Sequence, residues 1–294
     1  MTVSRADFIR RFLVTDSDVR GELVRLDRSY RTLLEAHYYP PPVRAILGQL
    51  LAAAPLLMAT VKFAGRLVLE LRGDGPVHLV VAECRSDHSL RGLARWREPI
   101  VDPSFSALVG GGQLLITLVN DRGGEPWQGR VPLEGGSVAA ALEHYFERSE
   151  QIATRVWLTG ADDMAGGLLV QRLPGAGEQS PPLAQTMKQL AAVAGGADLL
   201  GDDDLLAHAP EDLLRLALPG REVRLFEPQA LEFRCGCSPE RVESMLLALG
   251  RAELESLRAE RGEAEVTCEF CNRRYAYAGR ELAALIEAAS GSGE

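Results

Sequence analysis

The chain has 294 residues, 46% of them hydrophobic, which is enough for a sizeable buried core and favours two domains over one. Its formal net charge of −9 argues against a general nucleic-acid binder, because neutralising phosphates requires a surplus of Lys and Arg. The first residues alternate charged and apolar side chains without the continuous apolar segment of a signal peptide, so we expect a cytoplasmic protein.

The first 55 residues are predicted to form strands and then helices. Residues 8 to 27 are interpreted as two strands, because apolar and charged side chains partly alternate there. A helix over about residues 29 to 37 should end at the three prolines 40 to 42, whose ring-locked backbone cannot continue it. A longer helix should start at Val43, and Pro55 should kink or end it.

The most apolar stretch of the chain is residues 45 to 61. It is interrupted by Gln49 and Pro55 and falls short of the roughly 20 residues that a membrane-spanning helix needs. We therefore predict a buried helix and no membrane span.

From residue 62 the pattern changes to strands. Residues 66 to 71 and 77 to 84 predict a β-hairpin, in which Asp74-Gly75 should supply the positive φ of a tight turn. The sequence also predicts strands at residues 113 to 119, 127 to 133, 152 to 158 and 167 to 172, a turn at 121 to 124, and a helix at 137 to 150. These elements predict a mixed α/β (α+β) core domain over residues 1–175.

Composition shifts after Leu173. Residues 174 to 182 read PGAGEQSPP, a turn-rich break that we interpret as a domain boundary. Residues 176–230 form the predicted linker, and from residue 183 it is too rich in leucine to stay solvated. Short helices are expected at 183 to 194, after Asp202-Asp203-Asp204 and after Pro210. Because such helices are unstable alone, we expect them to pack on the core domain and to be able to separate from it.

The last 64 residues, 231–294, are predicted to form a small separate domain. Ser238 is a suitable N-cap for a helix that Gly250 should end. Residues 273 to 278 alternate as a strand does, and 281 to 289 predict a terminal helix. A domain of this size needs an additional stabilising element, and a metal ion is the obvious one.

Four of the five cysteines lie in this domain as two close pairs, Cys235-Gly236-Cys237 and Cys268-Glu269-Phe270-Cys271. Four thiolates can hold one tetrahedral zinc ion, and Cys-x-x-Cys is its usual half-site. Cys-x-Cys is tighter and less common. Because neighbouring cysteines can also reach disulfide geometry, oxidation of the pairs would eject the metal.

The cysteine pattern alone leaves several interpretations open. The simplest is a permanent structural zinc ribbon in a protein-interaction module. Another is a redox site, since Arg234, Arg241, Arg273 and Arg274 lie near the thiols in sequence and would favour reactive thiolates. A thioredoxin-type oxidoreductase is disfavoured because that motif needs a helix after the second pair, where we predict a strand. A nucleic-acid-binding ribbon is disfavoured by the acidic balance of residues 231–294.

Over nearly its whole length the chain resembles the redox-regulated chaperone family called heat shock protein 33. The resemblance is carried by the cysteine pattern at 235, 237, 268 and 271 and by blocks that occur in the family's order: LLMATVKFAGRLVLELRGDGPVHLVVAEC, LRGLARW, GGGQLLITLV, WQGRVPLEGGSVAAALEHYFERSEQIATRVWL and FRCGCSPERV. Several blocks in one order are far more specific than the cysteines alone.

The resemblance implies a non-enzymatic, ATP-independent holdase that is inactive while reduced and bound to one zinc ion through Cys235, Cys237, Cys268 and Cys271. Oxidation would form the disulfides Cys235–Cys237 and Cys268–Cys271, release zinc, unfold a metastable linker and expose an apolar surface to unfolding client proteins. It also implies a monomer when reduced and a homodimer when oxidised. Cys84 belongs to no part of this motif, and we expect it to be a buried apolar residue.

Overall fold

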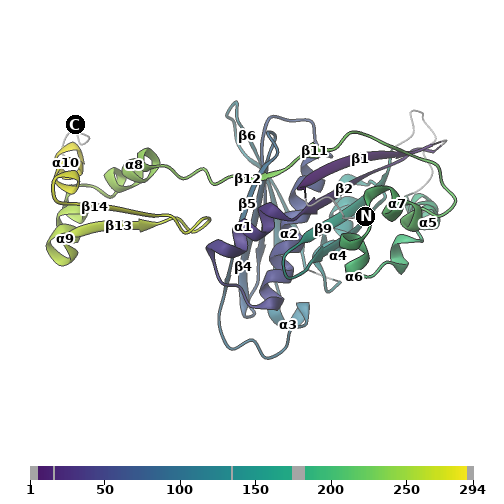
Figure 1. Ribbon diagram of the computed structural model, residues 1–294, viewed down its shortest axis with the longest axis horizontal. Helices are drawn as coiled ribbons and strands as arrows, with labels where there is room; N and C mark the ends of the chain where they lie inside the picture. Colours follow the sequence, from purple (N-terminus) through teal and green to yellow (C-terminus); the bar gives the residue numbers. More distant parts are fainter. Residues whose placement is uncertain (1–5, 16, 134, 174–182, 290–294) are drawn as a thin grey trace. The chain divides into compact units, whose positions relative to one another are not determined.

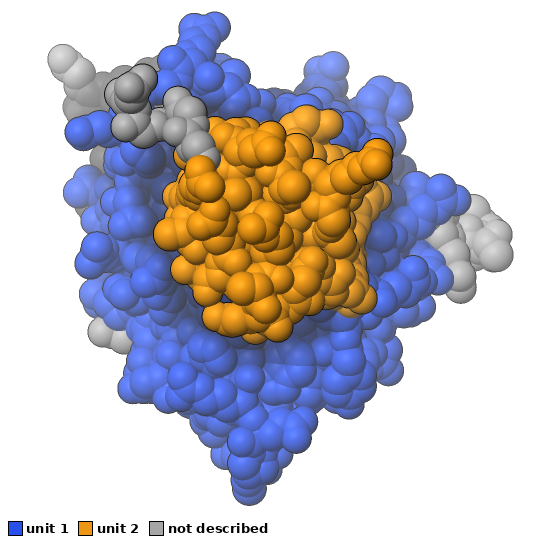
Figure 2. Space-filling model, turned by 90° about the vertical axis from the view of Figure 1, so that its left-hand side faces the viewer, with its two compact units in different colours: residues 1–234 blue, residues 235–294 orange. Residues whose placement is uncertain are grey.

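The computed structural model describes residues 6–15, 17–133, 135–173 and 183–289. The chain divides into two compact units, residues 1–234 and residues 235–294, which Figure 2 distinguishes by colour. The turn-rich break predicted at residues 174 to 182 lies outside the described residues. Figure 1 labels many of the elements of both units.

The first sheet of unit 1 has the strand order β10-β1-β2-β9-β8, with β11 also paired to β1, and all its pairs are antiparallel. Successive side chains of a strand point to opposite faces. Phe12 and Leu168 therefore face one apolar cluster, while Val24 and Leu169 face another, so both faces of the sheet are buried. The strands are β1 (Phe8–Val14), β2 (Val19–Leu26), β8 (Thr154–Gly160), β9 (Ala165–Arg172), β10 (Val223–Leu225) and β11 (Gln229–Ala230).

The second sheet has the order β12-β5-β4-β3-β6-β7, and only the β12–β5 pair among these described strands is parallel. Helix α2 (Pro41–Met58) contacts strands of both sheets, and its buried side chains fill the main core between them. The strands are β3 (Gly65–Arg72), β4 (Val77–Arg85), β5 (Ser89–Trp96), β6 (Gln113–Asn120), β7 (Trp127–Pro132) and β12 (Glu232–Phe233).

The predicted hairpin of β3 and β4 is confirmed, but the reason given for its glycine was wrong. Gly75 is not among the residues with positive φ in the described chain. A Cβ built on Gly75 would lie 2.5 Å from the carbonyl oxygen of Leu108, which is too close. The N–H of Gly75 donates a hydrogen bond to the carbonyl of Val109 at 3.0 Å. Glycine is needed there because helix α3 (Phe105–Val109) packs against the turn, and not because of the turn's backbone angles.

Helix α2 continues through Pro55 to Met58. The prediction that Pro55 could end the helix was therefore wrong. The proline removes one helical hydrogen bond. However, Leu56 and Leu57 are buried beyond it and the N–H of Ala59 still donates to the Pro55 carbonyl at 3.0 Å. By length and composition α2 could cross a membrane, but 72% of the helix is buried inside the protein, as we predicted for a core helix.

The remaining helices of the core are short. Helix α1 (Arg28–Ala36) follows β2, and the carboxylate of Asp7 accepts hydrogen bonds from the backbone N–H groups of residues 27 to 29 at its start. Helix α4 (Val138–Tyr145) is capped by Ser137, whose hydroxyl accepts from the N–H of Ala140 at 3.1 Å. A single π-helical turn (Phe146–Glu150) completes the predicted helix over 137 to 150.

Helices α5 (Leu183–Val193), α6 (Asp202–Ala207) and α7 (Pro210–Ala217), which lie in the predicted linker, cover the face of the first sheet that is turned away from α2. A 3₁₀ turn (Ala197–Leu199) lies between α5 and α6. The leucines that pack on the sheet from this side are Leu190, Leu205, Leu213, Leu214 and Leu218. The leucine-rich segment therefore packs on the first sheet of unit 1, as its composition predicts.

Unit 2 has a small core of its own. Val242, Leu246, Leu254, Leu282 and Ile286 pack together with the two tyrosines of its antiparallel hairpin. The elements are α8 (Pro239–Leu249), α9 (Arg251–Arg261), β13 (Glu263–Thr267), β14 (Arg274–Ala278) and α10 (Gly279–Ala289). The predicted mixed α+β fold class is confirmed by both units.

Candidate metal centre

The first cysteine pair lies between strand β12 and helix α8. Ser238 directly follows Cys237 and caps the helix, because its hydroxyl accepts a hydrogen bond from the N–H of Arg241 at 3.4 Å. Pro239 occupies the first turn, and Gly250 ends the helix with a φ of 86°, both as predicted. The start of α8 thus fixes the backbone directly after the pair.

The second pair lies in the turn between β13 and β14. The N–H of Cys268 donates to the carbonyl of Arg273 at 2.9 Å, and the N–H of Asn272 donates to the carbonyl of Cys268 at 2.8 Å. Asn272 has a φ of 57°, a left-handed conformation that asparagine tolerates better than most residues. This closed turn turns both thiols to the same side, as a zinc half-site requires.

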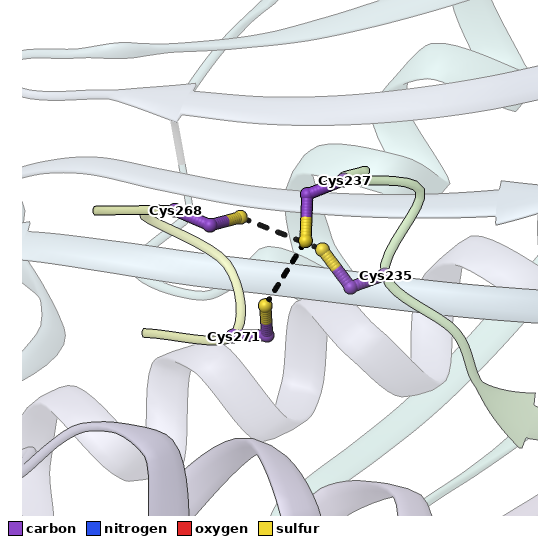
Figure 3. A group of neighbouring side chains, drawn as sticks. All are labelled: Cys235, Cys237, Cys268 and Cys271. Atoms are coloured by element: carbon purple, nitrogen blue, oxygen red, sulfur yellow. Dashed lines mark hydrogen bonds between the residues drawn. The ribbon is translucent and has the colours of Figure 1, made fainter. Parts of the chain in front are cut away.

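The structure brings all four thiols together (Figure 3). The four sulfur atoms all lie within 4.8 Å of one another, and each side chain is partly buried. The Cys235–Cys268 and Cys237–Cys271 sulfur distances are 3.5 Å and 3.4 Å, far longer than a disulfide bond, so the thiols are free. Sulfurs bound about 2.3 Å from a tetrahedral zinc ion lie about 3.8 Å apart, so the arrangement fits that ion.

The environment separates the pKa values of these thiols. Burial raises the pKa of Cys235 and of Cys271 above the ordinary value. Burial acts in the same direction on Cys237, but hydrogen bonds from the Tyr275 hydroxyl and the neighbouring thiols outweigh it and lower its pKa to about 7. Cys237 is therefore converted more easily than Cys235 or Cys271 to the thiolate, which is both the metal ligand and the nucleophile.

The four arginines that lie near the cysteines in sequence do not all face the thiols. Arg234 pairs with Asp87 and Glu232. Arg274 pairs with two glutamates of β13, and Arg241 donates to the carbonyl of Gly236. Arg273 acts electrostatically on Cys237 and Cys271, so the predicted cationic assistance comes chiefly from this residue.

Sequence reasoning did not identify Tyr275 as part of the site. Its hydroxyl lies 3.1 Å from the sulfur of Cys237, within hydrogen-bond distance. The position of Tyr275 on a predicted strand that starts just after Cys271 was the available signal. Sequence spacing alone cannot show that the side chain returns to the other cysteine pair.

Cys84 is separate from the site. It lies on β4 in the main core with 0% of its surface exposed, which confirms the prediction of a buried apolar residue. Burial raises the pKa of its thiol to about 12. A thiol in such surroundings is a poor nucleophile.

The chain is similar to known chaperones over nearly all of its length. The family model described as Hsp33 protein matches residues 7–278. A relative from Nitrosococcus oceani named 33 kDa chaperonin is 43% identical over 273 residues, covering 93% of this chain and 92% of the relative. One of the same name from Azotobacter vinelandii is 44% identical over 294 residues, covering 99% and 98%.

A crystal structure of the 33 kDa chaperonin (heat shock protein 33 homolog) from Thermotoga maritima has the same fold. It superposes with a TM-score of 0.83 at 24% identity, covering 97% of this chain and 99% of the other. The family is one of chaperones and not of enzymes. From the matched family model and the identity to these relatives, the chain belongs to the Hsp33 family.

Proposed function

We propose that this chaperone is an ATP-independent holdase switched on by oxidation of its four clustered cysteines. The observation that carries the proposal is the apolar face of the first sheet, which, among the described residues, the short helices α5 to α7 cover. In the resting state the helices would occupy this face. After oxidation the face would be free to hold unfolding client proteins.

Cys235, Cys237, Cys268 and Cys271 would hold one zinc ion, which when bound keeps the four sulfurs as thiolates and ties the two halves of the site together. The small core of unit 2 supports this assignment, because a segment of this size usually needs such an additional stabilising element. Loss of the thiolates would therefore destabilise unit 2.

Each disulfide forms in a two-electron oxidation. Two thiols and one molecule of hydrogen peroxide give one disulfide and two molecules of water, so both disulfides consume two molecules of peroxide. We propose the pairs Cys235–Cys237 and Cys268–Cys271, which the family resemblance implies. The short sulfur–sulfur distances of 3.5 and 3.4 Å are between Cys235 and Cys268 and between Cys237 and Cys271, and not within the proposed pairs. Peptide mapping of the oxidised protein must therefore decide the pairing.

The linker helices depend on their docking for stability. α5, α6 and α7 have 11, 6 and 8 residues. Isolated helices below about 12–15 residues are marginal in water. Freed from the sheet, they should unfold, which is the behaviour expected of a metastable linker over residues 176–230.

A buried charge at the docking surface also favours release. Arg25 on β2 is 1% exposed, and its Nη2 donates to the carbonyls of Leu205 at 3.2 Å and His208 at 2.5 Å. Its Nε and Nη1 have no hydrogen-bond partner among the described residues, and burial lowers the pKa of the guanidinium. Because a buried cation without a carboxylate is costly, covering Arg25 offsets part of the stabilisation from the apolar contacts.

The second candidate is a protein-interaction module in which the zinc ion is only structural. It is favoured by the separate core of unit 2, which would persist as a permanent ribbon. We further propose a cytoplasmic location, the domain limits 1–175, 176–230 and 231–294, and a reduced monomer that dimerises when oxidised.

The deciding experiment compares reduced and peroxide-treated protein in the thermal aggregation of a client without ATP. The oxidised protein should suppress aggregation while releasing about one zinc ion as four thiols are lost, and the reduced protein should not. Equal behaviour in both states, or zinc retained after complete oxidation, would favour the structural ribbon. Cys84→Ser serves as the control because this thiol lies in the main core.

A further inference from the structure

Tyr275 and Tyr277 form a natural comparison within the hairpin of unit 2. Both lie on β14, two residues apart and so on the same face of the strand, and they are 9% and 8% exposed. Both rings belong to the core of the unit. Their hydroxyls differ: that of Tyr275 donates to the Cys237 sulfur at 3.1 Å, whereas that of Tyr277 donates to the Pro239 carbonyl at 3.3 Å.

The Tyr275 hydroxyl donates to an acceptor that becomes anionic. Its hydrogen bond to the Cys237 sulfur at 3.1 Å is charge-assisted when that sulfur is a thiolate, and such bonds are stronger than those to a neutral acceptor. Arg273 also acts electrostatically on both Tyr275 and Cys237. Groups that hydrogen-bond to metal ligands hold them in position and tune their reactivity.

We propose that Tyr275 is a positioning residue that slows the oxidation of Cys237 in the reduced, zinc-bound site. There the metal would already hold Cys237 as a thiolate, so the hydrogen bond no longer promotes deprotonation and only lowers the nucleophilicity of the sulfur. The sulfur must use a lone pair to attack an oxidant, and the hydrogen bond from Tyr275 withdraws electron density from that atom and occupies one approach to it. This inference rests on the proposed redox switch, and it adds the residue that sets how readily the switch responds.

The reaction that Tyr275 would restrain is the first step of disulfide formation. The Cys237 thiolate donates an electron pair to one oxygen of hydrogen peroxide, the O–O bond breaks, and a sulfenic acid and hydroxide result. The sulfur of Cys235 then attacks the sulfenic sulfur, forming the S–S bond and releasing the sulfenic oxygen as water once protonated. Only the first step uses the lone pairs of Cys237, so the hydrogen bond acts there.

The test compares the zinc-loaded full chain with its Tyr275→Phe and Tyr277→Phe variants. Each substitution keeps the ring in the core and removes one hydroxyl. Reduced protein is mixed with excess peroxide and quenched with a maleimide at short times. Mass spectrometry then gives the rate at which the Cys237 thiol is lost, and dimedone in a parallel reaction traps its sulfenic acid.

We expect Tyr275→Phe to lose the Cys237 thiol about tenfold faster than the parent, which corresponds to about 1.4 kcal/mol in the barrier. Tyr277→Phe should react at the parent rate. Equal rates for all three proteins would overturn the inference while leaving the switch intact. A parent whose cysteines do not react with peroxide would overturn the switch and this inference with it.

A second measurement separates tuning from simple loosening of the site. Zinc transfer to a competing chelator is followed without oxidant in the three proteins. We expect Tyr275→Phe to transfer zinc at a rate close to that of Tyr277→Phe. If zinc transfer from Tyr275→Phe is instead accelerated by the same factor as the oxidation of Cys237, the hydroxyl only holds the site together, and the proposal is wrong.

Discussion

The docking of the linker can be tested at one buried leucine of helix α7. Leu213 is 0% exposed in the cluster between the linker and the first sheet, whereas Leu216 on the same helix is 47% exposed. Leu213→Ala removes side-chain atoms from a packed core, and Leu216→Ala removes them from solvent. The pair therefore isolates packing from any change in helix propensity, since both positions gain the same residue.

The expected magnitude follows from the burial. Replacing a fully buried leucine by alanine typically costs about 2–5 kcal/mol, and an exposed substitution stays within about 0.5 kcal/mol. Since about 1.4 kcal/mol is a factor of ten, Leu213→Ala should shift the equilibrium toward the undocked linker by roughly 30-fold to several thousand-fold. The reduced, zinc-bound variant should then suppress client aggregation in part without any oxidant.

The assay uses reduced protein throughout. Limited proteolysis measures linker opening, and client aggregation measures chaperone activity. Leu213→Ala should be cleaved faster than the parent between residues 183 and 217, and Leu216→Ala should match the parent. If Leu213→Ala opens the linker without any gain in activity, the covered face is not the client-binding surface. If it neither opens nor activates, the linker is not held by this packing.

The remaining predictions concern the metal, the unrelated thiol and one buried acid. Cys271→Ser should lower zinc affinity by orders of magnitude in a chelator competition, because one of four thiolates is lost. Cys84→Ser should leave both the zinc affinity and the oxidation rate unchanged. A larger loss of zinc affinity in Cys84→Ser than in Cys271→Ser would refute the ligand assignment. Removing zinc with a chelator under reducing conditions should lower the thermal transition of unit 2, and calorimetry showing no change would mean that the metal does not stabilise that unit. Burial raises the pKa of Glu22 despite its ion pair with Arg11, so the folded chain binds this proton more tightly than the unfolded chain. The stability that comes from the raised pKa is present in acid and is lost as the pH rises through the folded value. Glu22→Gln should therefore gain stability relative to the parent as the pH rises above about 4 in urea unfolding, and a difference independent of pH would contradict this.

Much of the fold was predictable because its long elements have clear periods. The β3–β4 hairpin, the β6–β7 pair and helix α8 follow directly from alternation, turn residues and capping. Strand β5 was not predicted, because its sequence SLRGLARW has neither a clean alternation nor an uninterrupted apolar run. Strands β10 to β12 have two or three residues each, too few to show any period.

The metal centre also has a part that the sequence predicts and a part that it does not. The clustering of four thiols was predictable from the spacing of the two pairs, since each spacing constrains the local backbone. The hydroxyl of Tyr275 could not be predicted, because its approach to Cys237 depends on how β14 packs in the folded unit. The roles of Pro55 and Gly75 could not be predicted either, because both depend on tertiary packing. Pro55 lies inside a continuous buried helix, and Gly75 lies against the backbone of helix α3.

The chain between the linker helices and Cys235 is the covalent route by which events at the thiols can reach the covered face. After α7 it adds three very short strands to existing edges: β10 and β11 pair with β1, and β12 pairs with β5. Strand β1 contributes Phe8 and Phe12 to the face that the linker covers. In the proposed switch, oxidation at Cys235 would act on a segment whose main-chain hydrogen bonds to unit 1 include one from the N–H of Arg234 to Leu90 at 3.0 Å and one from the N–H of Leu231 to Asp7 at 3.1 Å. Loss of these bonds would free the edge of β1 that lies beside α5 to α7, which links the thiols to the covered face.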